Sequence, residues 1–212
     1  MSLEVTVLDY GIGNQLNVLR ALEHCGATVK VVQKASAADV DAPRMVLPGV
    51  GAFGDGMAEL HARGFDDLVK RFAQTSRPFL GICVGMQVMF EASEEMGEHQ
   101  GLGLLQGRVC AVPAVGVNGL PHRIPHIGWR RLLPVAPWEG TILARVQPKE
   151  RVYFVHSFSA QPSRPGVRLA EVDYDGIPVC AAVHQDNLYG CQFHPERSAE
   201  TGLNVLRKFL QL

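Results

Sequence analysis

Residues 79–87 of the chain read Phe-Leu-Gly-Ile-Cys-Val-Gly-Met-Gln. An apolar, strand-like segment leads here into a helix-like segment at residues 86–90, and a glycine stands two positions before and two positions after Cys83. A sharp turn from strand to helix lifts a side chain above the edge of a sheet, and small neighbours let the backbone pack against it. The pattern predicts a nucleophile elbow with Cys83 at its tip, although a cysteine buried ahead of a core helix would show the same spacing.

An elbow of this kind suits attack on a carbonyl carbon. The backbone N–H of Val84, the residue after the cysteine, would point at the oxyanion that the attack creates. The N-terminus of the new helix would also favour the thiolate form of Cys83. The sequence therefore predicts a cysteine nucleophile with one oxyanion donor beside it.

Composition limits the classes of protein to consider. The 212 residues suit one domain spanning residues 1–212, because domains usually hold about 100–200 residues. A net charge of −1 without a Lys/Arg-rich block argues against nucleic-acid and membrane partners. The five cysteines form no Cys-x-x-Cys pair, and we find no leader or long apolar segment, so we expect a reduced, cytoplasmic protein.

Strand-like and helix-like patterns alternate ahead of the elbow. Strands are predicted at residues 3–8, 28–32 and 44–47, and helices at residues 56–62 and 65–73. An earlier helix is predicted to begin near Asn14 and to end at Gly26, with an apolar face formed by Leu16, Leu19, Ala21 and Leu22. Residues 101–135 and 151–183 predict short antiparallel strands. The expected fold class is α/β, an open, mostly parallel sheet with flanking helices and a small antiparallel β extension, with its site at the carboxyl ends of the strands.

Residues 48–54, Pro-Gly-Val-Gly-Ala-Phe-Gly, follow a predicted strand directly. The unobstructed N–H groups of such a loop could cradle a phosphate or supply the second half of an oxyanion hole. The loop lacks the Lys-Ser/Thr pair of a phosphate-binding P-loop, so the oxyanion role is favoured. Residues 9–14 contain Gly-x-Gly without the third glycine of a dinucleotide-binding turn.

A second reactive cluster precedes the last predicted helix. His194 and Glu196 are two residues apart, close enough for the carboxylate to orient the imidazole, and Pro195 stiffens the turn between them. With Cys83 they constitute a nucleophile, a base and an orienter of the base. His156 and His184 remain alternative bases.

Two spacings could instead suggest a metal. Cys191 and His194 have a Cys-x-x-His spacing but lack a second pair of ligands. His122 and His126 are four apart, but the prolines before them forbid a regular helix. We therefore expect neither a metal nor a cofactor.

The motifs resemble those of the class I glutamine amidotransferases. Residues 81–87 look like the nucleophile motif of that family, and residues 192–196 look like its His-Pro-Glu motif. Further segments are similar to one branch of the family, the glutaminase subunits of imidazole glycerol phosphate synthase in histidine biosynthesis; they are residues 9–14, 48–53, 125–129 and 153–157. The resemblance covers nearly the whole chain.

The resemblance implies hydrolysis of L-glutamine to glutamate and ammonia. It makes Cys83 the nucleophile that forms a thioester, His194 the proton shuttle and Glu196 the residue that holds His194. The residues that it assigns to the oxyanion hole and the glutamine pocket are Val50, Gly51, Val84, Gln87, Glu95 and Ser157.

The resemblance also implies a heterodimer. Ammonia would pass to a separate cyclase subunit, a (β/α)₈ barrel that makes imidazole glycerol phosphate and AICAR ribonucleotide. Asn14 and Trp129 would lie near the interface with that subunit. In the family, turnover is weak until the partner binds its ligand, and the glycines of the 48–51 loop would allow a peptide to flip as the switch.

Four positions depart from the family pattern. Val84 stands where Leu is usual, Phe158 where Tyr is common, and Ile127 and Arg130 replace Met and Asn. Other readings are the glutaminase of anthranilate synthase or of pyridoxal phosphate synthase, a glutaminase-like interaction module without turnover, and a stand-alone cysteine hydrolase of peptides or esters.

Overall fold

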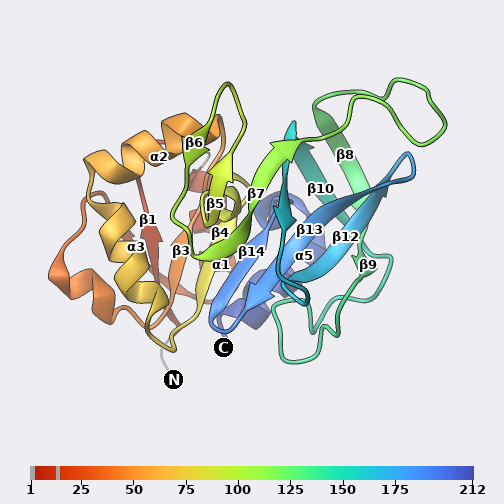
Figure 1. The fold of residues 1–212 in the computed structure, drawn as a ribbon. Helices are drawn as coiled ribbons and strands as arrows, with labels where there is room; N and C mark the ends of the chain where they lie inside the picture. The colour runs from red at the N-terminus through yellow and green to blue at the C-terminus, as the bar shows by residue number, and fades with distance from the viewer. Residues whose placement is uncertain (1–2, 13–14) are drawn as a thin grey trace.

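A computed structural model describes residues 3–12 and 15–212, and its largest sheet runs through the middle of the molecule (Figure 1). Among the described residues this sheet has the strand order β2-β1-β3-β4-β14-β13-β12-β9. The strands are β1 (Glu4–Leu8), β2 (Thr28–Val32), β3 (Met45–Leu47), β4 (Phe79–Ile82), β9 (Leu133–Pro134), β12 (Arg168–Tyr174), β13 (Ile177–Gln185) and β14 (Leu188–Cys191). The strands from β2 to β14 pair in parallel, and β13, β12 and β9 continue the sheet in antiparallel pairings.

Helices cover both faces of this sheet. They are α1 (Gln15–His24), α2 (Phe53–Ala62), α3 (Phe65–Ala73), α4 (Val84–Gln87) and α5 (Ala199–Phe209), with the short 3₁₀ helices η1 (Ala37–Asp41) and η2 (Pro195–Arg197). Helix α2 packs against α3 and α1 packs against α5, and Figure 1 shows α2 and α3 in front of the parallel strands and α5 behind them. No helix of the described ranges is both long and apolar enough to cross a membrane.

The buried face of α1 differs from the one that the sequence predicted. Val18, Ala21 and Leu22 are buried, but Leu16 is 54% exposed. Residue 16 lies about 200° around the helix from residue 18, because each residue turns the chain by about 100°. Including Leu16 in the apolar face was therefore wrong, while the helix itself was predicted correctly.

Two smaller sheets make up the rest of the β structure. One pairs β8 (His126–Arg131) with β10 (Arg151–His156), and the other has the order β11-β7-β5-β6, formed by β5 (Phe90–Ser93), β6 (His99–Gln100), β7 (Leu105–Ala111) and β11 (Phe158–Pro162). All pairings in them are antiparallel except that between β5 and β7. The predicted fold class, a mostly parallel α/β sheet with an antiparallel extension, is confirmed.

The segment behind the elbow is shorter than expected. Helix α4 ends at Gln87, and Phe90 already belongs to strand β5, so the helix predicted over residues 86–90 was wrong at its end. The apolar run is buried throughout, and a fully buried run carries no periodicity that separates helix from strand. A helix of one turn also gives a smaller dipole at Cys83 than the sequence suggested.

Candidate active site

Cys83 occupies the tip of a tight turn between β4 and α4. Its backbone has φ 54° and ψ −112°, a conformation that a residue with a side chain rarely adopts. Its N–H donates to the carbonyl oxygen of Cys191 over 2.7 Å, and the residue is 3% exposed. A strained conformation that neighbouring bonds hold in place is typical of a functional side chain.

The glycines on either side of Cys83 are needed for close packing of the backbone. A Cβ at Gly81 would lie 2.6 Å from the carbonyl oxygen of Gly85, and a Cβ at Gly85 would lie 1.9 Å from that of Leu47. Both distances are far below a van der Waals contact, and the obstructing atoms are backbone atoms that cannot swing away. The spacing of glycines around Cys83 is therefore the geometry of an elbow.

Strand β14 brings the second cluster to the elbow. It pairs in parallel with β4, with Cys191 opposite Ile82, so the residues that follow the two strands emerge at the same edge of the sheet. His194 follows β14 by three residues, and its Nδ1 lies 2.8 Å from Oε1 of Glu196. Both side chains are almost fully buried, so the imidazole is held with its other nitrogen, Nε2, free of a hydrogen-bond partner among the described residues.

The electrostatic surroundings of His194 favour its charged form. Burial alone lowers the pKa of an imidazole, but the Cys83 sulfur and the Glu196 carboxylate outweigh burial and raise the pKa of His194 to about 10. His194 therefore carries a proton near neutral pH, beside the Cys83 sulfur. An imidazolium in this position could give that proton to a leaving group.

The alternative bases are engaged elsewhere. His156 uses Nδ1 on the carbonyl oxygen of Phe158 (2.8 Å) and Nε2 on Nδ1 of His126 (3.1 Å), and burial lowers the pKa of His156 to about 4. His184 bonds the backbone carbonyl of Asp186 through Nε2, at 2.9 Å. Although Asp186 is a carboxylate two residues from a histidine, this contact is made by its backbone.

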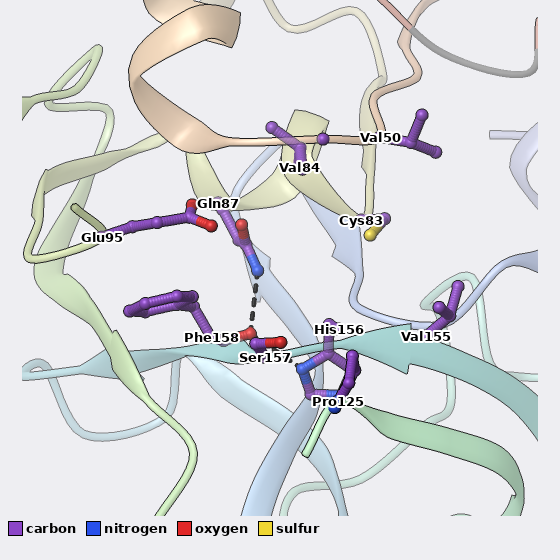
Figure 2. Close-up of a pocket in the computed structure, with 11 residues that line it drawn as sticks. Val50, Cys83, Val84, Gln87, Glu95, Pro125, Val155, His156, Ser157 and Phe158 are labelled. Atoms are coloured by element: carbon purple, nitrogen blue, oxygen red, sulfur yellow. Dashed lines mark hydrogen bonds between the residues drawn. The ribbon is translucent and has the colours of Figure 1, made fainter.

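A cavity of about 240 Å³ opens in front of Cys83 (Figure 2). It is smaller than the roughly 300–1,000 Å³ usual for drug-sized ligands, and it suits a molecule of amino-acid size. The residues lining it are Val50, Gly51, Cys83, Val84, Gln87, Glu95, Pro125, Val155, His156, Ser157 and Phe158. Every residue that the family resemblance assigned to the oxyanion hole or the glutamine pocket is among them, and the buried His194 lies near Cys83 with Glu196 bonded to it.

Four lining residues were not among the predicted site residues. Pro125 and Val155 belong to segments that carried the family resemblance, and His156 and Phe158 flank the predicted Ser157. For His156 and Phe158, their place on either side of a predicted residue was the signal that could have identified them, since the segment that joins β10 to β11 lines the cavity (Figure 2).

The polar groups of the cavity are held by the surrounding backbone. Oε2 of Glu95 accepts the N–H of Phe53, the first residue of α2, over 2.8 Å. Nε2 of Gln87 donates to the carbonyl oxygen of Phe158 over 2.9 Å (Figure 2). Both side chains are thus fixed at the wall while their remaining oxygen atoms can meet a ligand.

The predicted oxyanion donor is engaged in this structure. The N–H of Val84 donates to the carbonyl oxygen of Gly49 over 3.3 Å. That carbonyl and the N–H of Val50 belong to one planar peptide group. If this peptide group turned over, the Val84 N–H would be freed, and the Val50 N–H would point to the side that the Gly49 carbonyl oxygen now faces.

The two predicted interface residues lie outside the cavity. Trp129 is 42% exposed on β8 and meets the ring of Tyr153 edge to face, with centroids 6.1 Å apart. Asn14 falls outside the described residues. Within residues 3–12 and 15–212, no group of three or more His, Cys, Asp and Glu side chains is placed to hold a metal ion.

Comparison with known proteins gives the same family from sequence and from structure. The family model described as glutamine amidotransferase class-I matches residues 6–212. The chain is 49% identical over 211 residues to the imidazole glycerol phosphate synthase subunit HisH 1 of Legionella pneumophila (strain Lens), covering 98% of this chain and 99% of that protein. It is 41% identical over 210 residues to the subunit HisH of Aquifex aeolicus, with coverage of 98% and 96%.

The fold has solved counterparts at lower identity. The structure of PurLQS from Thermotoga maritima superimposes with a TM-score of 0.75 at 21% identity, covering 100% of this chain and 99% of that one. This likeness concerns the fold alone. Together with the matches in sequence, it leads to one conclusion: the chain belongs to the class I glutamine amidotransferases and, within them, to the HisH family of imidazole glycerol phosphate synthase subunits.

Proposed function

We propose that the chain hydrolyses L-glutamine to glutamate and ammonia and delivers the ammonia to the cyclase subunit of imidazole glycerol phosphate synthase. One observation carries the proposal: an elbow cysteine has a buried His194–Glu196 pair, 2.8 Å apart, delivered beside it by the neighbouring strand. The cavity in front of that cysteine suits an amino acid. In histidine biosynthesis the cyclase uses the ammonia to make imidazole glycerol phosphate and AICAR ribonucleotide.

The reaction would proceed in two halves. In the first, the Cys83 thiolate attacks the side-chain amide carbon of glutamine, the carbon–nitrogen bond breaks, and the proton held by His194 Nε2 leaves with ammonia. In the second, His194 takes a proton from water, the resulting hydroxide attacks the thioester carbon, and the carbon–sulfur bond breaks to return the thiolate. Glu196 keeps Nδ1–H of His194 occupied, so Nε2 remains the nitrogen that exchanges protons.

The far wall of the cavity would bind the amino-acid end of glutamine. Glu95 has one oxygen on the Phe53 N–H and the other available for the α-ammonium group. Ser157 lines the same cavity and offers a further polar atom, while Gln87 would meet the side-chain amide of glutamine. This placement would leave the side-chain amide facing Cys83 across the cavity.

The oxyanion hole would form only when the Gly49–Val50 peptide turns. In the conformation described, the Gly49 carbonyl occupies the Val84 N–H, so one donor is lost to the oxyanion. One missing donor typically costs about 10²–10³ in rate. The isolated chain should therefore turn over slowly, and docking of the cyclase near Trp129 would favour the turned peptide.

We place this reaction in the cytoplasm, because all five cysteines are free and the nucleophile must stay reduced.

The test measures glutamate released from L-glutamine by the purified chain, alone and with a matching cyclase subunit plus its nucleotide ligand. We expect slow release alone and strong stimulation in the complex. Cys83→Ala should lower release by about a thousandfold or more while leaving cyclase binding intact. Cys25→Ala is the matched control, because this thiol is only half-buried beside α5 and contacts the carbonyl oxygen of Leu203.

Each competing reading has its own outcome. Fast release without any cyclase would favour a stand-alone hydrolase, and stimulation by a different synthase subunit would move the chain to another pathway. No release under any of these conditions would leave a glutaminase-like interaction module. Full activity of Cys83→Ala would remove Cys83 from the mechanism.

A further inference from the structure

A buried chain of hydrogen bonds ends on the Cys83 sulfur. Nε2 of Gln192 lies 3.6 Å from Sγ of Cys83, and Oε1 of Gln192 accepts from Nε2 of Gln87 over 3.0 Å. Gln192 is 0% exposed on the segment that joins β14 to His194. A fully buried amide must have its polar atoms hydrogen-bonded, and both partners of Gln192 belong to the candidate site.

One backbone carbonyl fixes the direction of every bond in this chain. The carbonyl oxygen of Phe158 can only accept, so the Gln87 group that meets it at 2.9 Å must be the NH₂ group. The same NH₂ group faces Gln192, which must therefore present its oxygen to Gln87. The opposite end of Gln192 is then its NH₂ group, and an N–H donor is directed at the sulfur.

The same carbonyl is anchored on its other side. Nδ1–H of His156 donates to the Phe158 oxygen, and Nε2 of His156 accepts from His126. The pairing of β11 with β7, which sets Phe158 opposite Ala111, holds the backbone itself. The donor on the sulfur is therefore oriented by a rigid sheet and by no group that titrates near neutral pH, since burial lowers the pKa of both histidines to about 3 and about 4.

We propose that Gln192 is a further catalytic residue of the glutaminase reaction, with its N–H stabilising the Cys83 thiolate and its oxygen setting the orientation of Gln87. The inference rests on the proposed function, in which Cys83 is the nucleophile. Hydrogen bonds to a charged form favour that form. The second role acts on the substrate side: both protons of Gln87 are used inside the protein, so only its Oε1 is left for a ligand.

The orientation of Gln87 gives the cavity a chemical preference. An oxygen acceptor on the wall favours a ligand that presents an N–H group at that point and disfavours a carboxylate oxygen. Glutamine carries an N–H group at the end of its side chain, where its product glutamate carries a carboxylate. Both molecules carry the same α-ammonium group. A Gln87 amide that is free to rotate would lose the preference, because it could offer its NH₂ group to a carboxylate.

Two substitutions separate the two roles of Gln192. Gln192→Glu keeps an oxygen for Gln87 but replaces the donor on the sulfur with a negative charge, so kcat should fall at least tenfold while KM for glutamine changes less than about threefold. Gln192→Met removes both contacts, so KM should rise about tenfold as well and inhibition by glutamate should strengthen. Gln161→Met is the control, because Gln161 is exposed on β11.

The sulfur contact has a readout that needs no turnover. Mass spectrometry measures the rate at which iodoacetamide alkylates Cys83 in the chain alone at a series of pH values. The pH of half-maximal rate should be higher in both Gln192 variants and unchanged in the Gln161 control. Alkylation at pH 7 should slow about tenfold. An unshifted profile in folded Gln192 variants would overturn the proposal.

A measurement on the unsubstituted chain tests the contact between Gln192 and Cys83 even if the variants do not fold. Alkylation of Cys83 should move the side-chain amide resonances of Gln192 and Gln87 in a nitrogen–proton spectrum, whereas those of Gln161 should stay in place. Unmoved Gln192 resonances would overturn the contact. A shifted alkylation profile in a chain that never hydrolyses glutamine would instead reject the proposed function and retain the contact.

Discussion

At the scale of single residues, the candidate reactive groups of this protein are fixed by specific hydrogen bonds, some to residues distant in sequence and some to residues nearby. Cys83 keeps a strained backbone because its N–H is bonded to Cys191 and because Gly81 and Gly85, two residues before and after it, let the backbone pack closely. His194 is bonded to Glu196 through Nδ1, and its Nε2 has no hydrogen-bond partner among the described residues. The strain, of order 1–3 kcal/mol at such a residue, is offset by the surrounding sheet.

The charge on His194 should depend on Glu196. Because the carboxylate contributes to a pKa of about 10, Glu196→Gln should lower the pKa of His194, as followed by NMR titration of the ring protons. The folded pKa lies above the ordinary value of 6.5, so the stabilisation is complete below about pH 6.5 and disappears as the pH rises through about 10. The difference in free energy of unfolding between the unsubstituted chain and the variant should shrink in the same direction.

The control for that titration is Glu200→Gln, because Glu200 is an exposed carboxylate at the start of α5. It should leave the pKa of His194 unchanged. An equal shift in both variants would show that the effect is one of net charge and not of the His194–Glu196 contact.

Motif spacing alone singled out Cys83, His194 and Glu196 as candidate catalytic residues, because two glycines and a proline give those segments distinctive local patterns. It was not sufficient to predict the contacts of Gln192. These contacts arise because residues 188–191 form a strand next to β4, which brings position 192 against positions 83 and 87, more than 100 residues earlier. No local pattern carries that information.

At the scale of elements, the elbow depends on the contact between α4 and strand β3. A Cβ at Gly85 would lie 1.9 Å from the carbonyl oxygen of Leu47, so Gly85→Ala should destabilise the chain by about 3 kcal/mol or more in urea unfolding. Gly103→Ala meets no atom within 4 Å and has only a φ of +67° to strain it, so it should cost about 1–2 kcal/mol. Equal losses in the two variants would contradict this account of the elbow.

Strands β8, β10 and β12 are joined by a stack of rings around His126. Its ring lies 4.1 Å from that of Tyr174 and 5.1 Å from that of Phe154, nearly parallel to both, and its Nδ1 meets His156. A pattern of aromatic and histidine residues on three strands does not reveal such a stack before the strands are paired. The predicted β extension was therefore correct in kind, while the contacts that hold it to the site were not predictable.

The histidine pair should make the protein sensitive to acid. Burial lowers the pKa of His126 to about 3 and that of His156 to about 4. Below about pH 6.5 the unfolded chain therefore binds protons that the folded chain does not bind. The free energy of unfolding should therefore fall as the pH is lowered from about 6.5 to about 4. Urea unfolding at several pH values measures the slope.

His156→Gln should make that slope shallower, because a glutamine retains a donor and an acceptor but does not titrate. His184→Gln is the control, since His184 lies at the end of β13 with its Nε2 on a neighbouring carbonyl. A slope that is unchanged in His156→Gln would show that other groups cause the loss of stability in acid.

At the scale of the whole molecule, the chain closes its main sheet with its last strand. Strand β14 lies between β4, from the first half of the chain, and β13, from the second half. The parallel and antiparallel parts of the sheet therefore meet only through residues 188–191 among the described strands, and His194 follows immediately. The position of His194 beside the elbow therefore depends on strand pairings that both halves of the chain make.

This arrangement predicts that residues 1–212 unfold as one domain. The two tryptophans, Trp129 and Trp138, report on the region of β8 and β9, whereas far-ultraviolet circular dichroism reports mainly on helices α1, α2, α3 and α5, which pack on the main sheet. In a two-state transition these probes give the same midpoint and the same dependence on urea. Because β14 joins the two parts, we expect the two unfolding curves to coincide. Gly190→Val would place side-chain atoms against Met86 and Val183, so it should lower both midpoints together. Separate midpoints, or a loss confined to one probe, would show that the β extension folds independently and that the elbow can form without it.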